Sequence, residues 1–209
     1  MPELPVFAIA RHRIGIDGPG VTTLVGVQGC PLACRWCLNP HARDVNGRHR
    51  LYTAGELYDA VRIDNLYFAA TGGGVVFGGG EPLLHADFLP GFRALCGSGW
   101  KLSAETSLNV PAENVMCAAK AVDLFIVDIK DMNPDVYRRY TGRDNAQTVE
   151  NLERLLEAVG PQRVLVRVPL IPQYNEPADR EKSIAALRSL GVARIDSFSY
   201  VLRDGQAPH

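Results

Sequence analysis

The chain has 209 residues and a mass of 22.8 kDa, enough for one large domain or two small ones with a real core. Its 46% hydrophobic and 22% charged residues are typical of a globular protein, and a net charge of −1 gives no overall attraction to nucleic acid or anionic membranes. No apolar run reaches the roughly 18 residues of a spanning helix, and Met1–Pro5 lacks the order of a secretory signal. We therefore expect a cytoplasmic protein with neither nucleic-acid nor membrane partners.

Short apolar runs rich in β-branched residues alternate along the chain with segments of helical spacing. The first of these runs ends at a cluster of cysteines. Lengths of four to eight residues favour strands over helices in such runs. Six strands are predicted, over residues 21–27, 74–77, 101–105, 124–130, 163–170 and 195–202.

The segments between these strands carry helix start and stop signals. Thr53 and Glu56 have the spacing of a capping box, and Leu66 would extend the apolar face of the helix that they begin. Gly191 suits a C-terminal stop. Five helices are predicted, over residues 53–66, 85–97, 111–121, 148–159 and 177–190.

Alternation of strands and helices predicts parallel βαβ units and therefore an α/β fold. Six strands are too few for a closed eight-stranded barrel, which takes about 250 residues. A doubly wound sheet and an open partial barrel both fit this pattern. Without a repeat or a linker, residues 1–209 are predicted to form a single domain, with a mobile polar loop over 38–50 and a frayed tail after Arg203.

Cysteine usage is the most informative part of the composition. Cys30, Cys34 and Cys37 fall within eight residues, whereas Cys96 and Cys117 stand apart and are expected to be small core residues of helices. Three clustered thiolates can converge on one iron–sulfur cluster, and a four-iron cluster would then keep one iron without a protein ligand. A zinc site with His41 as its fourth ligand, a thiol–disulfide pair of Cys34 and Cys37, and an inert buried trio are the alternatives.

Polar residues also follow the next four predicted strands, where the edge of a parallel sheet gathers ligands. Gly79, Gly80 and Glu81 form a turn that is either a flexible connection or a place for close backbone approach to a ligand. Two further groups need partners if they are buried: Asp128 with Lys130, which could simply pair with each other, and Arg167. Glu105, Thr106 and Ser107 complete the set, and four such strand ends together favour a single site.

Together these residues resemble the radical S-adenosylmethionine (SAM) superfamily, and within it the activating enzymes of glycyl radical enzymes, such as pyruvate formate-lyase activating enzyme. The resemblance covers most of the chain. It rests on Ile16–Gly20, on the Cys-x3-Cys-x2-Cys spacing of Cys30, Cys34 and Cys37 with Trp36 before the last of them, on Asn39–Pro40, on Gly79–Glu81, on Asp128–Met132 and on Tyr140–Gly142.

The resemblance implies an open (β/α)6 partial barrel with parallel strands and a role for each motif. Cys30, Cys34 and Cys37 would hold a 4Fe–4S cluster whose unique iron binds the amino and carboxylate groups of SAM, with Trp36 near the adenine. The other implied contacts are Gly79, Gly80 and Glu81 with the methionyl ammonium, Asp128 and Lys130 with the methionine or ribose, Glu105, Thr106 and Asp128 with a monovalent cation, and Asp17 and Arg167 with the glycyl loop of a partner.

The implied activity is that of a radical SAM oxidoreductase working under anaerobic conditions. One electron from a flavodoxin- or ferredoxin-like donor cleaves SAM to methionine and a 5′-deoxyadenosyl radical, which takes a hydrogen from a glycine of a glycyl radical enzyme. Alternatives are the activating subunit of an anaerobic ribonucleotide reductase, a radical SAM enzyme for a peptide or small molecule, and a zinc-bound or degenerate interaction module.

The chain departs from the activating enzymes at two positions where relatives often carry histidine. Leu38 follows the third cysteine, and Val201 follows Ser199–Tyr200. No cysteine lies between Cys37 and Cys96, so the resemblance implies the short form without an auxiliary-cluster insert.

Overall fold

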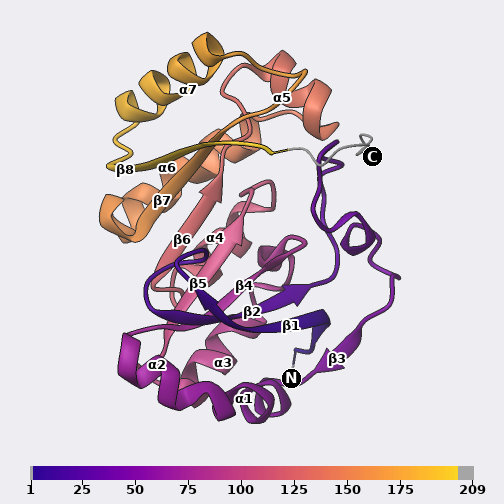
Figure 1. Cartoon of the computed structure of the whole chain (residues 1–209), viewed down its shortest axis with the longest axis vertical. Helices are drawn as coiled ribbons and strands as arrows, with labels where there is room; N and C mark the ends of the chain where they lie inside the picture. Colours follow the sequence, from indigo (N-terminus) through magenta and orange to yellow (C-terminus); the bar gives the residue numbers. More distant parts are fainter. Residues whose placement is uncertain (1, 202–209) are drawn as a thin grey trace.

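The computed structural model describes residues 2–201, and they form one curved sheet with helices on its outside (Figure 1). The sheet has eight strands in the order β3-β1-β2-β4-β5-β6-β7-β8. Neighbours from β2 to β8 pair in parallel, whereas β1 pairs antiparallel with both β2 and β3. The strands are β1 (Leu4–Ile14), β2 (Val21–Val27), β3 (Arg50–Tyr52), β4 (Gly74–Gly79), β5 (Lys101–Thr106), β6 (Leu124–Asp128), β7 (Val164–Leu170) and β8 (Arg194–Ser199).

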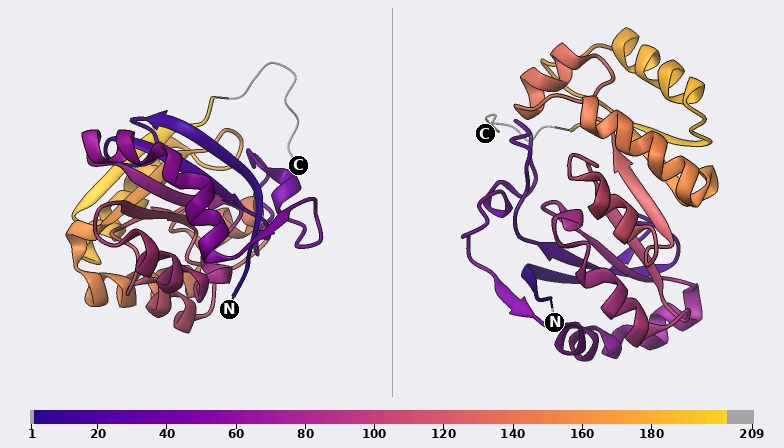
Figure 2. Two further views of the ribbon diagram at one scale, coloured as in Figure 1. Left: turned by 90° about the horizontal axis from the view of Figure 1, so that it is seen from below. Right: turned by 180° about the vertical axis from the view of Figure 1, so that it is seen from behind.

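The six parallel strands confirm the predicted α/β fold and its open partial barrel. Strands β3 and β8 are the two edges and do not pair with each other, so the barrel is not closed. Both views in Figure 2 show helices around the outside of the sheet. The helices are α1 (Ala54–Val61), α2 (Asn65–Thr71), α3 (Phe88–Cys96), α4 (Ala112–Ala118), α5 (Pro134–Thr141), α6 (Ala146–Val159) and α7 (Pro177–Ser189).

The central strands are buried on both faces. Helices cover the outer face of the sheet, and the inner face is enclosed by the curvature of the sheet itself. Val75, Val76 and Phe77 of β4 and Phe125, Ile126 and Val127 of β6 are completely buried. Continuous apolar runs of this kind are what parallel strands require, since neither face alternates with water. The main core lies between these strands and the helices, and it includes the partly buried Cys96 and Cys117, as predicted for packing residues.

Helix signals in the sequence were located correctly in most cases. Thr53 and Glu56 form the predicted capping box at the start of α1. The predicted 53–66 helix is wrong in its second half: α1 ends at Val61, a 3-10 turn follows, and α2 begins at Asn65, which leaves Leu66 75% exposed. The 3-10 turn over Arg62–Asp64 interrupts the α-helical spacing, so Leu66 no longer continues the apolar face.

Three elements were not predicted from the sequence. Strand β1 is one of them because its charged residues Arg11 and Arg13 interrupt the apolar pattern and its ladder has two register shifts. Strand β3 lies in the predicted 38–50 loop and just beyond it, with a 3-10 turn over Pro40–Ala42. Helix α5 begins at an Asn133 cap with Pro134 at its first position, a start signal that the apolar pattern alone does not reveal.

Two further findings concern the C-terminal tail and the question of membrane-spanning helices. The predicted frayed tail after Arg203 falls outside the described residues. Within residues 2–201, no helix combines the length and the apolar composition that crossing a membrane requires.

Candidate functional site

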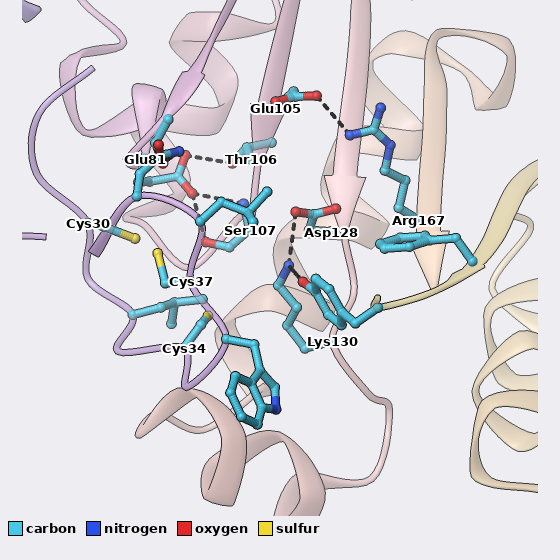
Figure 3. A pocket seen from close by; sticks show the side chains of 18 of the residues that line it. Cys30, Cys34, Cys37, Glu81, Glu105, Thr106, Ser107, Asp128, Lys130 and Arg167 are labelled. Carbon is cyan, nitrogen blue, oxygen red and sulfur yellow. Dashed lines mark hydrogen bonds and ion pairs between the residues drawn. The ribbon is translucent and has the colours of Figure 1, made fainter. Parts of the chain in front are cut away.

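A cavity of about 490 Å³ opens where the parallel strands β2, β4, β5, β6 and β7 end. Figure 3 shows the cysteine loop on one side of this cavity. The side chains at the ends of the other strands lie on the opposite side. A volume of this size suits a ligand as large as a nucleoside derivative. The cavity brings together nearly all residues predicted for the site: Cys30, Cys34, Trp36, Cys37, Gly79, Gly80, Glu81, Glu105, Thr106, Asp128, Lys130 and Arg167.

The cysteine loop is held in place by backbone hydrogen bonds to two other segments. Gly29 N–H donates to the Ala42 carbonyl at 2.7 Å, and Ala33 N–H donates to the Thr141 carbonyl at 2.8 Å. All three cysteines are free thiols, half-buried, on the cavity wall. Burial raises the pKa of Cys30 to about 12 and that of Cys34 to about 11. Thiolates in such a place need a bound cation to compensate the cost of burial.

The turn after β4 packs directly on the base of the cysteine loop. Gly80 N–H donates to the Val27 carbonyl at 2.9 Å, and Glu81 N–H donates to the Gly29 carbonyl at 2.8 Å. A Cβ at Gly80 would lie 2.3 Å from the Gly29 carbonyl oxygen, closer than any real contact. Gly80 therefore permits the close approach of the two loops. The predicted approach of this turn to a ligand stays a prediction.

A Gly80→Ala variant is expected to lose about 3 kcal/mol of stability and to bind less iron, because its Cβ meets rigid backbone. Urea denaturation and iron analysis after anaerobic reconstitution would measure both effects. Gly55→Ala is the matched control, since nothing lies within 4 Å of its Cβ position in α1 and alanine favours a helix. Equal stability and iron content in the two variants would contradict the packing role of Gly80.

Glu81 is buried, with only 1% of its surface exposed, and its carboxylate accepts four hydrogen bonds. Thr106 Oγ1 donates at 2.7 Å, Ser107 donates through Oγ at 2.7 Å and through N–H at 2.8 Å, and Leu83 N–H donates at 3.1 Å. The side chain therefore ties the end of β4 to the end of β5. Its predicted contact with a ligand ammonium stays a prediction.

Lys130 and Asp128 form the ion pair that their spacing allowed. Lys130 Nζ lies 3.0 Å from Asp128 Oδ2 and donates to the Tyr200 hydroxyl at 3.4 Å. Burial alone would lower the pKa of Lys130, but Asp128 and Tyr200 outweigh it and hold that pKa well above its ordinary value. The cavity wall thus carries a permanent cation that a carboxylate or ribose oxygen could contact.

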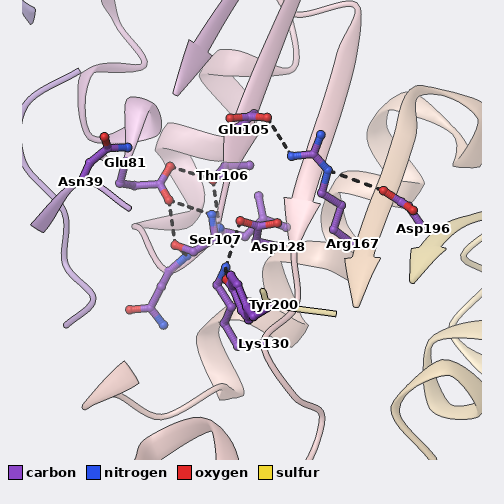
Figure 4. A network of polar contacts seen from close by, with 12 residues as sticks. Asn39, Glu81, Glu105, Thr106, Ser107, Asp128, Lys130, Arg167, Asp196 and Tyr200 are labelled. Atoms are coloured by element: carbon purple, nitrogen blue, oxygen red, sulfur yellow. Dashed lines mark hydrogen bonds and ion pairs between the residues drawn. The ribbon is translucent and has the colours of Figure 1, made fainter. Parts of the chain in front are cut away.

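Arg167 connects three strands at the rim of the cavity (Figure 4). It donates to Glu105 Oε1 at 2.8 Å and to the Ile16 carbonyl at 2.6 Å, and its Nε lies 3.9 Å from Asp196 Oδ2. Arg167 therefore attaches the loop between β1 and β2 to the ends of β5 and β7.

Burial raises the pKa of Glu105 to about 7, an effect that Arg167 opposes and that Asp128 and Asp17 reinforce. Because this value lies above the ordinary 4.5, the folded state keeps the proton to higher pH than the unfolded chain does. The stability that this proton contributes is complete below about pH 4.5 and is lost as the pH rises through about 7. Relative to Glu105→Gln, the wild type is expected to lose about 2 kcal/mol between pH 5 and pH 8. Urea denaturation of both proteins at the two pH values would measure this difference. The same change in the free energy of unfolding in the wild type and in Glu105→Gln would contradict the prediction.

One residue predicted for the site, Asp17, lies away from the cavity. Asp17 is buried and bonded to Arg13, with one contact at 2.9 Å, and it does not line the cavity. Glu105, Thr106 and Asp128, the residues predicted to hold a monovalent cation, all line the cavity, and each bonds to another side chain: Thr106 to Glu81, Glu105 to Arg167 and Asp128 to Lys130. The cation site stays a prediction. Within residues 2–201, no three His, Cys, Asp or Glu side chains lie close enough to share one ion.

The alternative of a zinc site needs His41 as its fourth ligand, beside the three cysteines. His41 packs edge-on against Phe7 at 4.9 Å between ring centroids and is not on the cavity wall. A four-iron cluster takes one cysteine per iron, so its cysteines stand farther apart than the ligands of a single ion. The cysteine loop fits a cluster in this respect, because its three thiols line one cavity, and that wall has no fourth cysteine and no histidine within residues 2–201.

Tyr140 and Tyr200 belong to motifs of the sequence, but neither of them was predicted to have a role in the site. Both line the cavity, and Tyr140 packs with Trp36 in a small apolar cluster beside Cys34. The indole N–H of Trp36 donates to the Pro172 carbonyl at 3.3 Å. Tyr140 lies on the unpredicted α5 and Tyr200 just beyond β8, so no strand-end rule pointed to them.

Comparison with known proteins agrees with this geometry. The sequence profile of the radical SAM superfamily matches residues 24–193. The chain belongs to the radical SAM superfamily. Among curated relatives, pyruvate formate-lyase-activating enzyme of Listeria monocytogenes is 30% identical over 88% of this chain and 77% of its own length. Isethionate sulfite-lyase activating enzyme of Desulfovibrio desulfuricans is 28% identical over 87% of this chain and 77% of its own.

Solved structures support the fold of this radical SAM enzyme. Streptococcus suis SuiB bound to S-adenosylmethionine superposes with a TM-score of 0.65 at 14% identity, over 85% of this chain. The match covers 40% of the SuiB chain. Methylornithine synthase superposes with a TM-score of 0.56 at 12% identity. At these identities the likeness concerns the fold, which is the partial barrel described above.

Proposed function

We propose that this chain activates a glycyl radical enzyme, and that Cys30, Cys34 and Cys37 hold the 4Fe–4S cluster of the reaction. When bound, the cluster supplies one electron that cleaves SAM to methionine and a 5′-deoxyadenosyl radical, which abstracts hydrogen from a glycine Cα of the partner. The observation that carries the proposal is the shared cavity: three thiols, with no fourth cysteine or histidine among the described residues of the wall, face the Asp128–Lys130 pair across space for one nucleoside-sized molecule.

The residues that line the cavity would bind and orient SAM and the glycyl loop of the partner. Lys130 would contact the methionyl carboxylate or a ribose oxygen of SAM, because it is a buried cation on the cavity wall. Trp36 and Tyr140 offer an apolar surface for the adenine beside Cys34. Arg167 at the rim would contact the glycyl loop of the partner. The half-buried wall limits water near the reactive centre.

Three finer points remain proposals of the same kind. The partner class comes from the curated relatives, which are named as activating enzymes of pyruvate formate-lyase, isethionate sulfite-lyase and sulfopropanediol dehydratase. A cytoplasmic location is proposed because such partners are metabolic enzymes. A monovalent cation would bind the oxygens of Glu105, Thr106 and Asp128, whose present bonds use Glu105 Oε1, the Thr106 hydroxyl hydrogen and Asp128 Oδ2 and leave other lone pairs free.

The test is anaerobic reconstitution with iron and sulfide, reduction with dithionite in the presence of SAM, and chromatography of the products. We expect a brown protein with about four irons per chain that forms 5′-deoxyadenosine and methionine in equal amounts. Adding pyruvate formate-lyase should then give a glycyl radical signal in electron paramagnetic resonance. An intact cluster without 5′-deoxyadenosine would refute the proposal, and stoichiometric zinc in a colourless protein would do the same.

Lys130→Ala is expected to weaken SAM binding about 10- to 100-fold and to leave the iron content near four, because the change removes a charge-assisted contact and spares the thiols. Equilibrium dialysis with SAM and iron analysis measure the two quantities separately. Lys120→Ala is the control, since this lysine is exposed and lies beyond α4. Loss of iron in Lys130→Ala would show that its role lies in the cysteine loop instead.

A further inference from the structure

The hydroxyl of Tyr140 is a buried polar group without a hydrogen-bond partner. Within residues 2–201, three buried side-chain atoms lack such a partner: Gln28 Oε1, Tyr140 Oη and Arg180 Nε. Of these three residues only Tyr140 lines the cavity, and it is completely buried. A buried hydroxyl that stays unpaired is unfavourable, because it has left water without gaining another partner. The wall of the cavity therefore holds one hydrogen-bonding group that the described part of the protein does not satisfy.

Helix α5 carries a second buried tyrosine whose hydroxyl is satisfied. Tyr137 lies one turn before Tyr140 and is also completely buried, but it does not line the cavity. Its hydroxyl lies 3.2 Å from Oγ1 of Thr148, a residue of α6. Tyr140 packs instead against the apolar side chains of Trp36 and Ile171. The same helix thus offers two buried hydroxyls, one used inside the protein and one at the cavity.

The Tyr140 side chain lies beside the ion pair of the cavity wall. Its ring centroid is 6.5 Å from that of Tyr200, whose hydroxyl accepts a hydrogen bond from Lys130 Nζ at 3.4 Å. Figure 4 shows Tyr200 directly beside Lys130, which also bonds to Asp128. We call Asp128, Lys130, Tyr140 and Tyr200 the polar corner. Burial, reinforced by Tyr200, raises the pKa of Tyr140 well above its ordinary value, so its hydroxyl keeps the proton and can donate.

The polar corner combines hydrogen-bond donors with an acidic acceptor. Tyr140 offers an O–H and Lys130 offers N–H groups, whereas Asp128 uses Oδ2 for Lys130 and keeps the lone pairs of Oδ1. A ligand carboxylate could only accept, and it would meet Asp128 as a like charge. A vicinal diol both accepts and donates, so it matches the whole corner. Ribose supplies such a diol.

We propose that Tyr140 is a positioning residue whose hydroxyl donates a hydrogen bond to a ribose hydroxyl of SAM, an inference that rests on the proposed function. Trp36 and the ring of Tyr140 belong to one cluster beside Cys34, where adenine would lie. The ribose is bonded directly to the adenine, so it would follow at the hydroxyl end of the same tyrosine, in the polar corner. The bond satisfies the Tyr140 hydroxyl only in the complex, and its free energy therefore goes into affinity and orientation.

The test removes one hydroxyl at a time from the two tyrosines of α5. The test variant is Tyr140→Phe, which keeps the ring that packs on Trp36. The control variant is Tyr137→Phe, which loses a hydroxyl that already has Thr148 as its partner. Both variants and the wild type are reconstituted anaerobically. Iron analysis, equilibrium dialysis with SAM and urea denaturation without SAM are then carried out on all three.

We expect Tyr140→Phe to raise the Kd for SAM about fivefold and to keep the iron content of the wild type, because the change removes one hydrogen bond and spares the thiols. Its midpoint of urea denaturation without SAM should be at least as high as that of the wild type, since phenylalanine leaves no buried hydroxyl unpaired. Tyr137→Phe should show the opposite pattern, with a lower midpoint and a Kd within about twofold of the wild type.

Two SAM analogues, 2′-deoxy-SAM and 3′-deoxy-SAM, identify the group that Tyr140 contacts. For one of them the Kd should be the same in the wild type and in Tyr140→Phe, to within about twofold, because the analogue already lacks the other half of the bond. An equal loss of affinity for SAM and for both analogues in Tyr140→Phe would overturn the ribose contact. A lower urea midpoint with an unchanged Kd for SAM would show that the hydroxyl serves the protein itself, and it would overturn the proposal too.

Failure of the Tyr140 contact and failure of the proposed function give different results. If the wild type with about four irons neither binds nor cleaves SAM, the proposed function is wrong, and the role of Tyr140 is wrong with it. If the wild type binds and cleaves SAM while Tyr140→Phe binds it as tightly as the wild type does, only the role of Tyr140 is wrong.

Discussion

A Cys34→Ala variant is expected to lose the iron–sulfur cluster, with iron falling from about four to less than about one per chain. The physical reason is the number of ligands. Among the described residues that line the cavity there is no fourth cysteine and no histidine to replace a missing thiol, so the variant would keep only two thiolate ligands. Formation of 5′-deoxyadenosine should fall to background. Iron analysis, the visible spectrum and product chromatography after anaerobic reconstitution measure these losses.

Cys96→Ala is the matched control, because it removes the same thiol from a partly buried position in α3 that lies outside the cavity. It should keep about four irons and lose at most about 1 kcal/mol of stability. A Cys34→Ala protein that retains the full iron content and cleaves SAM would disprove the assignment of the three cysteines.

A Glu81→Ala variant is expected to lose about 4 kcal/mol of the free energy of unfolding. Four donors of Leu83, Thr106 and Ser107 would lose their acceptor inside a water-poor site. The ends of β4 and β5 would no longer be joined, so SAM binding should weaken as well. Urea denaturation and equilibrium dialysis with SAM measure the two effects.

Glu113→Ala provides the comparison, since Glu113 is an exposed glutamate in the first turn of α4. It should cost no more than about 0.5 kcal/mol. If Glu81→Ala were as stable as Glu113→Ala, the hydrogen-bond network around the Glu81 carboxylate would not be a structural support. Unchanged stability with weaker SAM binding would instead favour the direct ligand contact that the sequence suggested.

The carboxylates of the site have different structural partners, which the sequence alone does not reveal. Glu81 is fully used in joining two strand ends, Glu105 in holding Arg167, and Asp128 in holding Lys130. Buried carboxylates without such partners would be costly. Each of these carboxylates therefore has a structural role in addition to the ligand contact predicted for it.

Much of the parallel sheet could be predicted because its strands are apolar throughout and lie between recognisable helices. Strand β6 and helix α7 are examples, the latter with Pro177 at its first turn and Gly191 just after it. Strands β1 and β3 could not be predicted in this way. They form the antiparallel edge, where one face meets water and charged residues such as Arg11 and Arg50 are tolerated.

The sequence by itself determined the chemistry of this protein: three cysteines at fixed spacing, a Gly-Gly-Glu turn and an Asp-x-Lys pair after consecutive strands. Local spacing is enough for this, because the parallel strands of one sheet bring their ends to one edge. Only the tertiary structure decided what each side chain contacts. It placed Asp17 against Arg13, Glu81 under Ser107, and Tyr140 and Tyr200 on the wall. These contacts join residues distant in sequence, and their partners are selected by packing and by the cost of leaving a buried polar group unpaired.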